Sequence, residues 1–337
     1  MNTIAFQHRM AAHCETGTIC ALLQHAGLEI TEPMIFGVAG GIFFGYFKGQ
    51  QFTFPTFIVR TKPGDIRKRI KKVLGVKFKT YNFSNPKKAE EELNRLLDQN
   101  IPVAVQVDFF YMDYMPAWQR VHINVHFITI IGRKENKYIV SDAYFPRIAE
   151  IDRETLSKAR FAGGSFAPKG FMYYVESVPN HIDYFKVIRK GLKKAVFNML
   201  KIPIPFLGVK GIVTFSKKIN EWPKLARNEE HLSHEIMKIN ILLEDQGTGG
   251  AGFRFMFATF LRQASELLRN DDLLDLSKRM MEIGDGWREI SLFAVRIGKK
   301  RDLGSERIKE LSGLIMNRAI VEKAFFLELK NVLKKIK

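Results

Sequence analysis

The pattern of apolar and polar positions predicts an early helix in the chain. Between residues 14 and 26, Ile19, Leu22, Leu23 and Ala26 recur at spacings of three and four, and Gly27 follows as a stop. The next apolar stretch, "PMIFGVAGGIFFGYF" at 33–47, is rich in glycine, which predicts tight packing and close backbone approach.

Two amphipathic helices and then several strands are expected next. The segments "PGDIRKRIKKVLG" and "NPKKAEEELNRLLDQN" each carry a proline near the first turn of a helical pattern. Three later segments, "IPVAVQVDFF", "VHFITIIGRKENKYIVSDAYF" and "GFMYYVESV", are rich in β-branched and aromatic residues, with "RKEN" as a hairpin turn. This order predicts an α+β fold with a mostly antiparallel sheet.

After Pro179 the periodicity becomes helical almost to the end of the chain. Only "IPIPFLGVKG" at 202–211, with two prolines and two glycines, interrupts it as a linker or crossover. With 337 residues, the chain exceeds the size of one typical core. We therefore predict two domains, one over residues 1–178 and an α-helical one over residues 179–337.

The start of the chain lacks the pattern of a secretory signal, and no apolar run reaches the length of a membrane span. We expect a cytoplasmic protein with no transmembrane segment. Cys14 and Cys20, if on one helix, are about 9 Å apart along its axis, too far for a disulfide. Both thiols are expected to be reduced.

Charge suggests the kind of partner. The formal net charge is +18, which favours an acidic partner: nucleic acid, an anionic membrane surface or an acidic carrier protein. The basic residues lie in scattered short clusters, and no nucleic-acid-binding motif is present, so we expect no nucleic-acid partner. A homodimer is compatible with this sequence.

Cys14 stands where the first helix is predicted to begin. A helix N-terminus carries about half a positive charge and unpaired N–H groups, which favour a thiolate and can hold an oxyanion. The adjacent Glu15 opposes this effect unless it turns outward. The alternative is that Cys14 only fills space near the helix end.

A nucleophilic cysteine needs a base and a group that orients the base. His126 stands in the strand "NVHFITIIG", and Asp142 ends the next strand, "YIVSDAYFP". Across a hairpin the two can lie close together, so that Asp142 fixes the imidazole. Taken singly, His126 is better explained as a core histidine and Asp142 as a turn former. The three residues in this order and arrangement favour a catalytic set.

These residues and their surroundings resemble a known family. The stretch "HCETGTICALLQHAGLEITEPMIFGVAGGIFFGYF", with "HFITIIG" and "VSDAYFP", resembles the N-terminal family of the butirosin biosynthesis protein H, a papain-like cysteine fold related in shape to bacteriocin-processing peptidases. "GTGGAGFRFMFATFLRQASELL" and "GDGW" resemble the helical domain that follows it. The resemblance implies a papain-like catalytic domain at 1–178 with Cys14 as nucleophile, His126 as base and Asp142 as its orienter.

The resemblance also implies a reaction. It is transfer of an acyl or aminoacyl group from the phosphopantetheine thioester of a carrier protein, through an enzyme thioester, to a small-molecule amine in specialised-metabolite biosynthesis. An acidic carrier protein would use the basic charge for docking, and "FKVIRKGLKKAVFNMLK" is one candidate face, with a solvated helix as the alternative. No cofactor is expected to reside on the chain, because the carrier brings the phosphopantetheine.

Further candidates surround this core assignment. Papain-like enzymes place an oxyanion-donating Gln shortly before the cysteine, and here Gln7, His8 and His13 are the candidates, with a capping role as the alternative for His13. The candidates for substrate binding are Glu32, Gly40, Gly41 and Arg254.

Two motifs are expected to carry no separate chemistry. "GTGGAG" at 247–252 follows a helical pattern and lacks a P-loop lysine, so we interpret it as a tight interhelical turn that would bring Arg254 near an anionic group. "HLSH" at 231–234 lacks a third ligand, and no metal is expected.

Two other functions stay open. The same three residues with water as acceptor would make a cysteine peptidase or amidase. A basic binding module without catalysis is the third alternative, and it requires Cys14 to be unreactive.

Overall fold

The computed structural model describes residues 2–48 and 54–336. Its Cα packing divides the chain into two compact units. Unit 1 comprises Met1–Ile35 and Ile66–Ile182, and unit 2 comprises Phe36–Asp65 and Asp183–Lys337. The expected domains, 1–178 and 179–337, differ from this division mainly in one segment, 36–65, which packs with the second unit.

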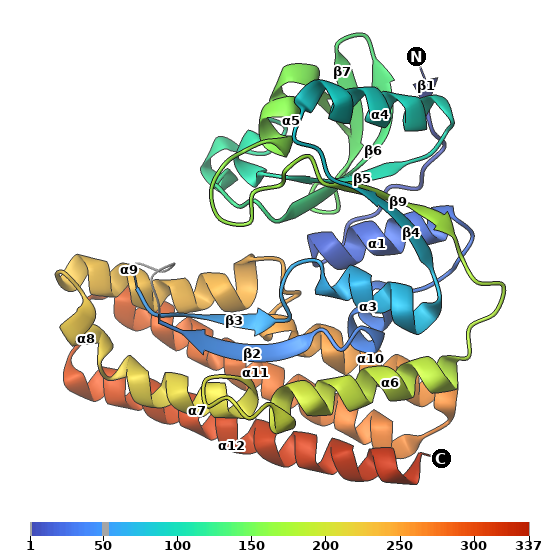
Figure 1. Ribbon diagram of the computed structural model, residues 1–337. Helices are drawn as coiled ribbons and strands as arrows, with labels where there is room; N and C mark the ends of the chain where they lie inside the picture. The colour runs from blue at the N-terminus through green and yellow to red at the C-terminus, as the bar shows by residue number, and fades with distance from the viewer. Residues whose placement is uncertain (1, 49–53, 337) are drawn as a thin grey trace. The chain divides into compact units, whose positions relative to one another are not determined.

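Unit 1 is built on an antiparallel sheet of seven strands, in the order β4-β9-β5-β6-β7-β8, with β1 paired to β6 beyond the end of β5 (Figure 1). The strands are β1 (Asn2–Thr3), β4 (Lys77–Tyr81), β5 (Val103–Val107), β6 (His126–Lys134), β7 (Lys137–Ser141), β8 (Ala149–Asp152) and β9 (Met172–Ser177). The predicted antiparallel sheet is confirmed, and "RKEN" supplies the β6–β7 turn, where Glu135 adopts a positive φ of 53°.

Helices cover both faces of this sheet. They are α1 (Cys14–His25), α3 (Asp65–Leu74), α4 (Pro86–Asp98) and α5 (Arg153–Arg160), with single 3₁₀ turns at Phe109–Tyr111 and Ala117–Gln119. Alternate residues of β5 and β6, such as Val105 and Ile128, form one core with Leu93 of α4 and Leu156 of α5. Helix α1 packs against β6 and β9, and Figure 1 shows it on the opposite face from α4.

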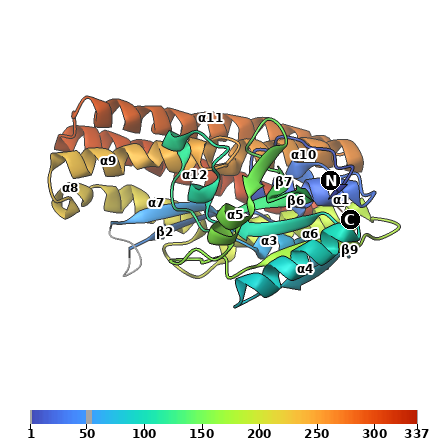
Figure 2. The ribbon, with the colours of Figure 1, turned by 90° about the horizontal axis from the view of Figure 1, so that it is seen from above.

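Unit 2 is helical, as expected for the second half of the chain. Its helices are α6 (Tyr184–Val196), α7 (Gly208–Ile219), α8 (Trp222–Leu225), α9 (Glu229–Asn240), α10 (Arg254–Leu268), α11 (Asp271–Lys299) and α12 (Ser305–Lys335). Single π turns at Phe197–Lys201 and Ile241–Asp245 extend α6 and α9, and a 3₁₀ turn at Ala251–Phe253 precedes α10. Figure 2 shows the two longest helices, α11 and α12, running side by side.

A hairpin from the first part of the chain belongs to this helical unit. Strands β2 (Ile42–Phe47) and β3 (Thr56–Arg60) pair antiparallel, and β2 is buried along almost its whole length. The Phe44 ring stacks on Phe215 and Trp287 at centroid distances of 6.1 and 5.8 Å. An apolar strand of this kind must bury both faces, and the aromatic helices of unit 2 provide that cover.

The helix α2 (Glu32–Val38) carries the chain from one unit into the other. The segment 202–211 connects α6 to α7 inside unit 2, where the Phe206 carbonyl accepts a hydrogen bond of 2.9 Å from the Tyr46 N–H. The "GTGGAG" segment turns between two helical segments, with a positive φ at four of its glycines.

Replacing Gly37 by alanine is expected to destabilise unit 2, because the new methyl group would overlap the buried Phe260 ring. Such overpacking costs about 1–3 kcal/mol. Gly313, in the exposed face of α12 with open space around it, is the matched control, and Gly313→Ala should stabilise by up to about 1 kcal/mol. Urea unfolding of the full chain measures both, and equal effects of the two substitutions would contradict this account of Gly37.

Candidate functional site

Cys14 is the first residue of α1, and the turn before it is held by side chains. His13 is the N-cap residue, with Nδ1 accepting from the Thr16 N–H. The Glu32 carboxylate accepts from the N–H groups of Ala12 and His13, at 3.0 and 2.9 Å, and from the Thr16 hydroxyl at 2.7 Å. These bonds fix the backbone on both sides of Cys14.

The capping pattern leaves backbone donors at the nucleophile. The first N–H groups of an α-helix have no intrahelical acceptor, and Cys14 occupies the first helical position. Its sulfur lies 3.7 Å from the carbonyl oxygen of Val125, and the residue retains 9 % exposure. A carbonyl substrate at this sulfur would therefore meet N–H donors of the helix start.

His126 is the base candidate that the fold brings to this thiol. It begins β6, and its ring is a hydrogen-bond partner of the Cys14 side chain. The His126 Nε2 donates to Oδ2 of Asp142 at 2.8 Å, so Nδ1 is the nitrogen left for Cys14. The fold thus joins the three residues that the sequence singled out as nucleophile, base and orienter.

The strand register explains how His126 and Asp142 meet. The last paired residues of β6 and β7 are Thr129 and Ser141, so one step further Asp142 stands opposite Ile128. His126 is two residues from Ile128 along the same face, which makes His126 and Asp142 diagonal neighbours within side-chain reach.

Asp142 is completely buried and has several donors. Besides His126, it accepts from the Tyr114 hydroxyl at 2.8 Å and from the Tyr144 N–H at 2.9 Å. Burial raises the pKa of Asp142, but the charge of His126 and these hydrogen bonds outweigh it, and the pKa is lowered. Sequence reasoning missed Tyr114, because a tyrosine in a loop segment gives no periodic signal.

The same interactions act on the histidine. Burial lowers the pKa of His126, but the Asp142 carboxylate, and to a smaller extent Cys14, outweigh burial and raise the pKa to about 10. The thiol, the imidazole and the carboxylate thus follow one another in a chain of contacts.

The three oxyanion candidates have other partners. The exposed Gln7 side chain accepts from Arg9, and both ring nitrogens of His8 are bonded, to the Ser141 hydroxyl at 2.8 Å and the Phe145 carbonyl at 2.9 Å. His8 therefore ties the segment before α1 to the end of β7. His13 takes the capping role at the start of α1.

The substrate-binding candidates are also engaged within the protein. Glu32 holds the turn before α1, as described above. In unit 2, Gly40 has a positive φ of 64° and packs against Lys194, and Gly41 packs against Phe36. These two glycines allow close packing in unit 2, and their contact with substrate stays a prediction.

Arg254 was expected to face an anionic group of a substrate. In the structure its anionic partner is the carboxylate of Glu322, inside the protein. Its guanidinium is fully buried and makes two hydrogen bonds, of 2.9 and 3.2 Å, with Glu322. The Trp287 indole donates to the same carboxylate at 2.6 Å. A buried pair with this geometry neutralises its own charge, so Arg254 is part of the unit 2 core.

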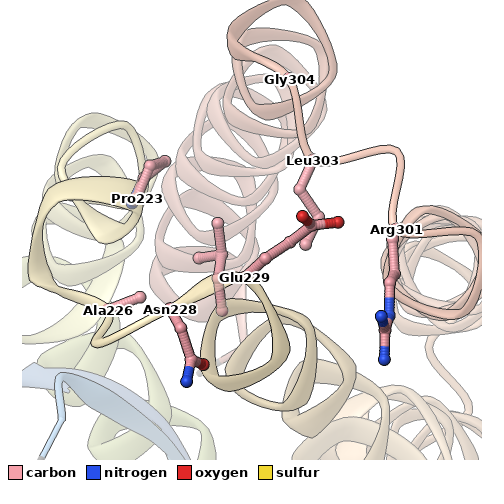
Figure 3. A pocket seen from close by; sticks show the side chains of 8 residues that line it. Pro223, Ala226, Asn228, Glu229, Arg301, Leu303 and Gly304 are labelled. Atoms are coloured by element: carbon pink, nitrogen blue, oxygen red, sulfur yellow. The ribbon is translucent and has the colours of Figure 1, made fainter.

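Unit 2 holds a pocket of about 450 Å³ (Figure 3). None of the site candidates predicted from the sequence lines it. Its lining includes Asn228 and Glu229 at the start of α9, and Arg301 and Leu303 between α11 and α12. No cysteine or histidine lines it. The nearby "HLSH" histidine His231 accepts from the Arg227 N–H and contacts Glu235, and no group of three potential metal ligands occurs among residues 2–48 and 54–336.

The chain matches two family models. Residues 13–143 match the family described as butirosin biosynthesis protein H, N-terminal, and residues 154–329 match the domain of unknown function DUF4872. The DUF4872 model covers just over half of the chain, so the chain belongs to that family. No curated protein matches it in sequence.

Among solved structures, a candidate C39-like peptidase from Bacillus anthracis is similar, with 15 % identity and a TM-score of 0.37. The similarity covers 53 % of this chain and 100 % of that chain. In the described part of this family member, no helix is both long and apolar enough to cross a membrane.

Cys14 is expected to react with iodoacetamide at pH 6 at least about tenfold faster than Cys20, because the adjacent His126 ring can act as the base for its thiol. Cys20 is the internal control: burial, followed by the charge of Glu32, raises its pKa to about 12. Peptide mass spectrometry measures both rates. His126→Ala should slow the reaction of Cys14 and leave that of Cys20 unchanged, whereas equal rates for the two thiols would contradict an activated Cys14.

The His126–Asp142 pair should make stability depend on pH. The raised pKa of His126 gives stability that is complete below its ordinary value of 6.5 and is lost as the pH rises through about 10. The lowered pKa of Asp142 gives stability that is present above 3.8 and is lost as the pH falls through its folded value. Asp142→Asn should therefore cost about 3 kcal/mol in urea unfolding at pH 6 and clearly less at pH 10.

Tyr114→Phe is the matched control for this pH dependence. It removes a neutral donor to Asp142, and the pKa of that tyrosine is raised well above 10, by burial and then by Asp142. Its cost should stay near 2 kcal/mol at both pH values. An Asp142→Asn penalty that is identical at pH 6 and pH 10 would rule out the charged pair.

Proposed function

We propose that this protein is a cysteine-dependent acyltransferase of biosynthesis. It takes an acyl or aminoacyl group from the phosphopantetheine thioester of a carrier protein, holds it on Cys14 and delivers it to an amine. The observation that carries the proposal is the thiol at the start of α1 hydrogen-bonded to an imidazole that a buried carboxylate fixes. The match of residues 13–143 to the N-terminal family of butirosin biosynthesis protein H supports transfer within a biosynthetic route.

The first half-reaction loads the enzyme. The Cys14 thiolate attacks the thioester carbonyl of the donor, and the N–H groups at the start of α1 stabilise the oxyanion. The carbon–sulfur bond to phosphopantetheine then breaks, and the His126 imidazolium donates its Nδ1 proton to the departing thiolate. The products are the Cys14 thioester, neutral His126 and the free carrier thiol.

The second half-reaction releases the product. The amine nitrogen attacks the Cys14 thioester, the bond from carbon to the Cys14 sulfur breaks, and an amide forms. The nitrogen loses a proton in this step, and His126 takes a proton back as Cys14 returns to its starting state. The two halves form a ping-pong cycle.

The charge of the catalytic unit suits an acidic carrier protein. Exposed lysines gather on α3 and on β4, which is an edge strand of the sheet: Lys68, Lys71, Lys72, Lys77 and Lys79. In unit 2, Lys186, Lys190 and Lys193 are exposed on α6, the docking face expected from the sequence. Complementary charge speeds encounter and orients docking, and it is screened by salt.

Cys14→Ala is expected to abolish transfer and leave the fold intact, because it removes the nucleophilic sulfur and no other atom of the buried helix start. The measurement is intact-mass spectrometry after incubation with acyl carrier thioesters, where the added mass also identifies the donor. Cys20→Ala is the matched control and should be loaded like the wild type. Loading of the Cys14→Ala variant would refute the mechanism, and a loaded wild type that releases only free acid would make the protein a hydrolase.

A further inference from the structure

Unit 1 contains a second histidine–carboxylate pair besides His126 and Asp142. The His122 Nδ1 lies 2.7 Å from Oδ2 of Asp108. Asp108 is buried, and its other oxygen accepts from the N–H groups of Phe110 and Ile123 at 3.1 and 3.0 Å. The mechanism described above does not use this pair.

The strand register places the pair near Cys14. The last paired residues of β5 and β6 are Val107 and His126, so one step further Asp108 stands opposite Val125. The Val125 carbonyl is the group that lies 3.7 Å from the Cys14 sulfur. His122 is three residues before Val125, which limits the separation of their Cα atoms to about 11 Å.

The surrounding contacts tie the pair to the site. The Phe109 N–H donates to the Ile123 carbonyl at 3.0 Å, and the Phe109 ring packs edge-on against the His126 ring at a centroid distance of 4.9 Å. The two histidines are therefore supported by one pair of adjoining segments, 108–110 and 122–126.

The ring of His122 is fixed but accessible. It stacks on Phe110 at a centroid distance of 4.2 Å, and its side chain is 64 % exposed. Because the carboxylate of Asp108 can only accept, Nδ1 of His122 donates, and Nε2 of the neutral ring carries the lone pair. A ring nitrogen with a lone pair thus faces solvent on the segment 122–126, which also carries the Val125 carbonyl at the Cys14 sulfur.

We propose that His122 is the base that takes the proton from the incoming amine. This inference rests on the proposed acyl transfer. An alkylamine arrives protonated at neutral pH and cannot attack until it loses that proton. His122 Nε2 accepts it, the free amine attacks the Cys14 thioester, and the second nitrogen proton goes to His126 as the carbon–sulfur bond breaks. His126 thus exchanges protons with the groups at the Cys14 sulfur, and His122 takes the first proton of the acceptor amine.

The test begins from enzyme already acetylated on Cys14 with p-nitrophenyl acetate, in a Cys20→Ser background that leaves one thiol. Two acceptors are compared at pH 7: ethanolamine, which is protonated, and hydroxylamine, which is largely neutral. Intact-mass spectrometry follows loss of the acetyl group. For ethanolamine, His122→Ala should slow transfer on the order of a hundredfold, the usual contribution of a general base, while hydroxylamine should react as with wild type.

His122→Asn separates the base from a structural role. Asparagine can still donate to Asp108 but has no basic nitrogen, so the proposal requires it to fail with ethanolamine as alanine does. Full activity of His122→Asn, or equal slowing with both acceptors, would show that His122 only fastens the loop and would overturn the proposal. Failure of the wild type to become acetylated would instead refute the proposed function and this inference with it.

Discussion

The site of unit 1 depends on one buried carboxylate, that of Asp142. A charge with no exposure is costly unless it is paired and hydrogen-bonded, and Asp142 receives three donors, from His126, Tyr114 and the Tyr144 backbone. Each donor reaches it from a different part of the chain. Satisfying this carboxylate therefore fixes the imidazole ring, the loop before β6 and the turn after β7 together.

A second carboxylate, that of Glu32, positions the thiol, as Asp142 positions the imidazole. Glu32 binds two backbone N–H groups and a hydroxyl around the start of α1. Burial raises the pKa of Glu32, which these hydrogen bonds partly offset. His8 adds a link from the segment before α1 to the end of β7. Glu32 thus fixes the backbone that carries the Cys14 sulfur, and Asp142 fixes the His126 ring. Both reacting groups are held in place by hydrogen bonds to buried side chains.

The further inference gives the two histidines different tasks. His126 is buried and faces the sulfur, whereas His122 is exposed and faces solvent. A transferase has to manage a proton on the thiol and another on the acceptor, while a hydrolase meets an acceptor, water, that arrives uncharged. A separate base for a protonated amine is consistent with transfer, and it links the proposed reaction to a particular loop.

The sequence by itself determined the strands β5, β6, β7 and β9, the helix start at Cys14 and the pairing of His126 with Asp142, but not β1, β4 and β8. These follow from local periodicity and from the two-residue hairpin turn, which fixes register over a few residues. Tertiary structure alone decided the partners of Glu32, Arg254, Gly40 and Gly41, and the unit to which segment 36–65 belongs. The sequence shows that a buried charge needs an opposite charge and that an apolar strand needs cover on both faces. Which residues supply them depends on packing between segments far apart in the chain.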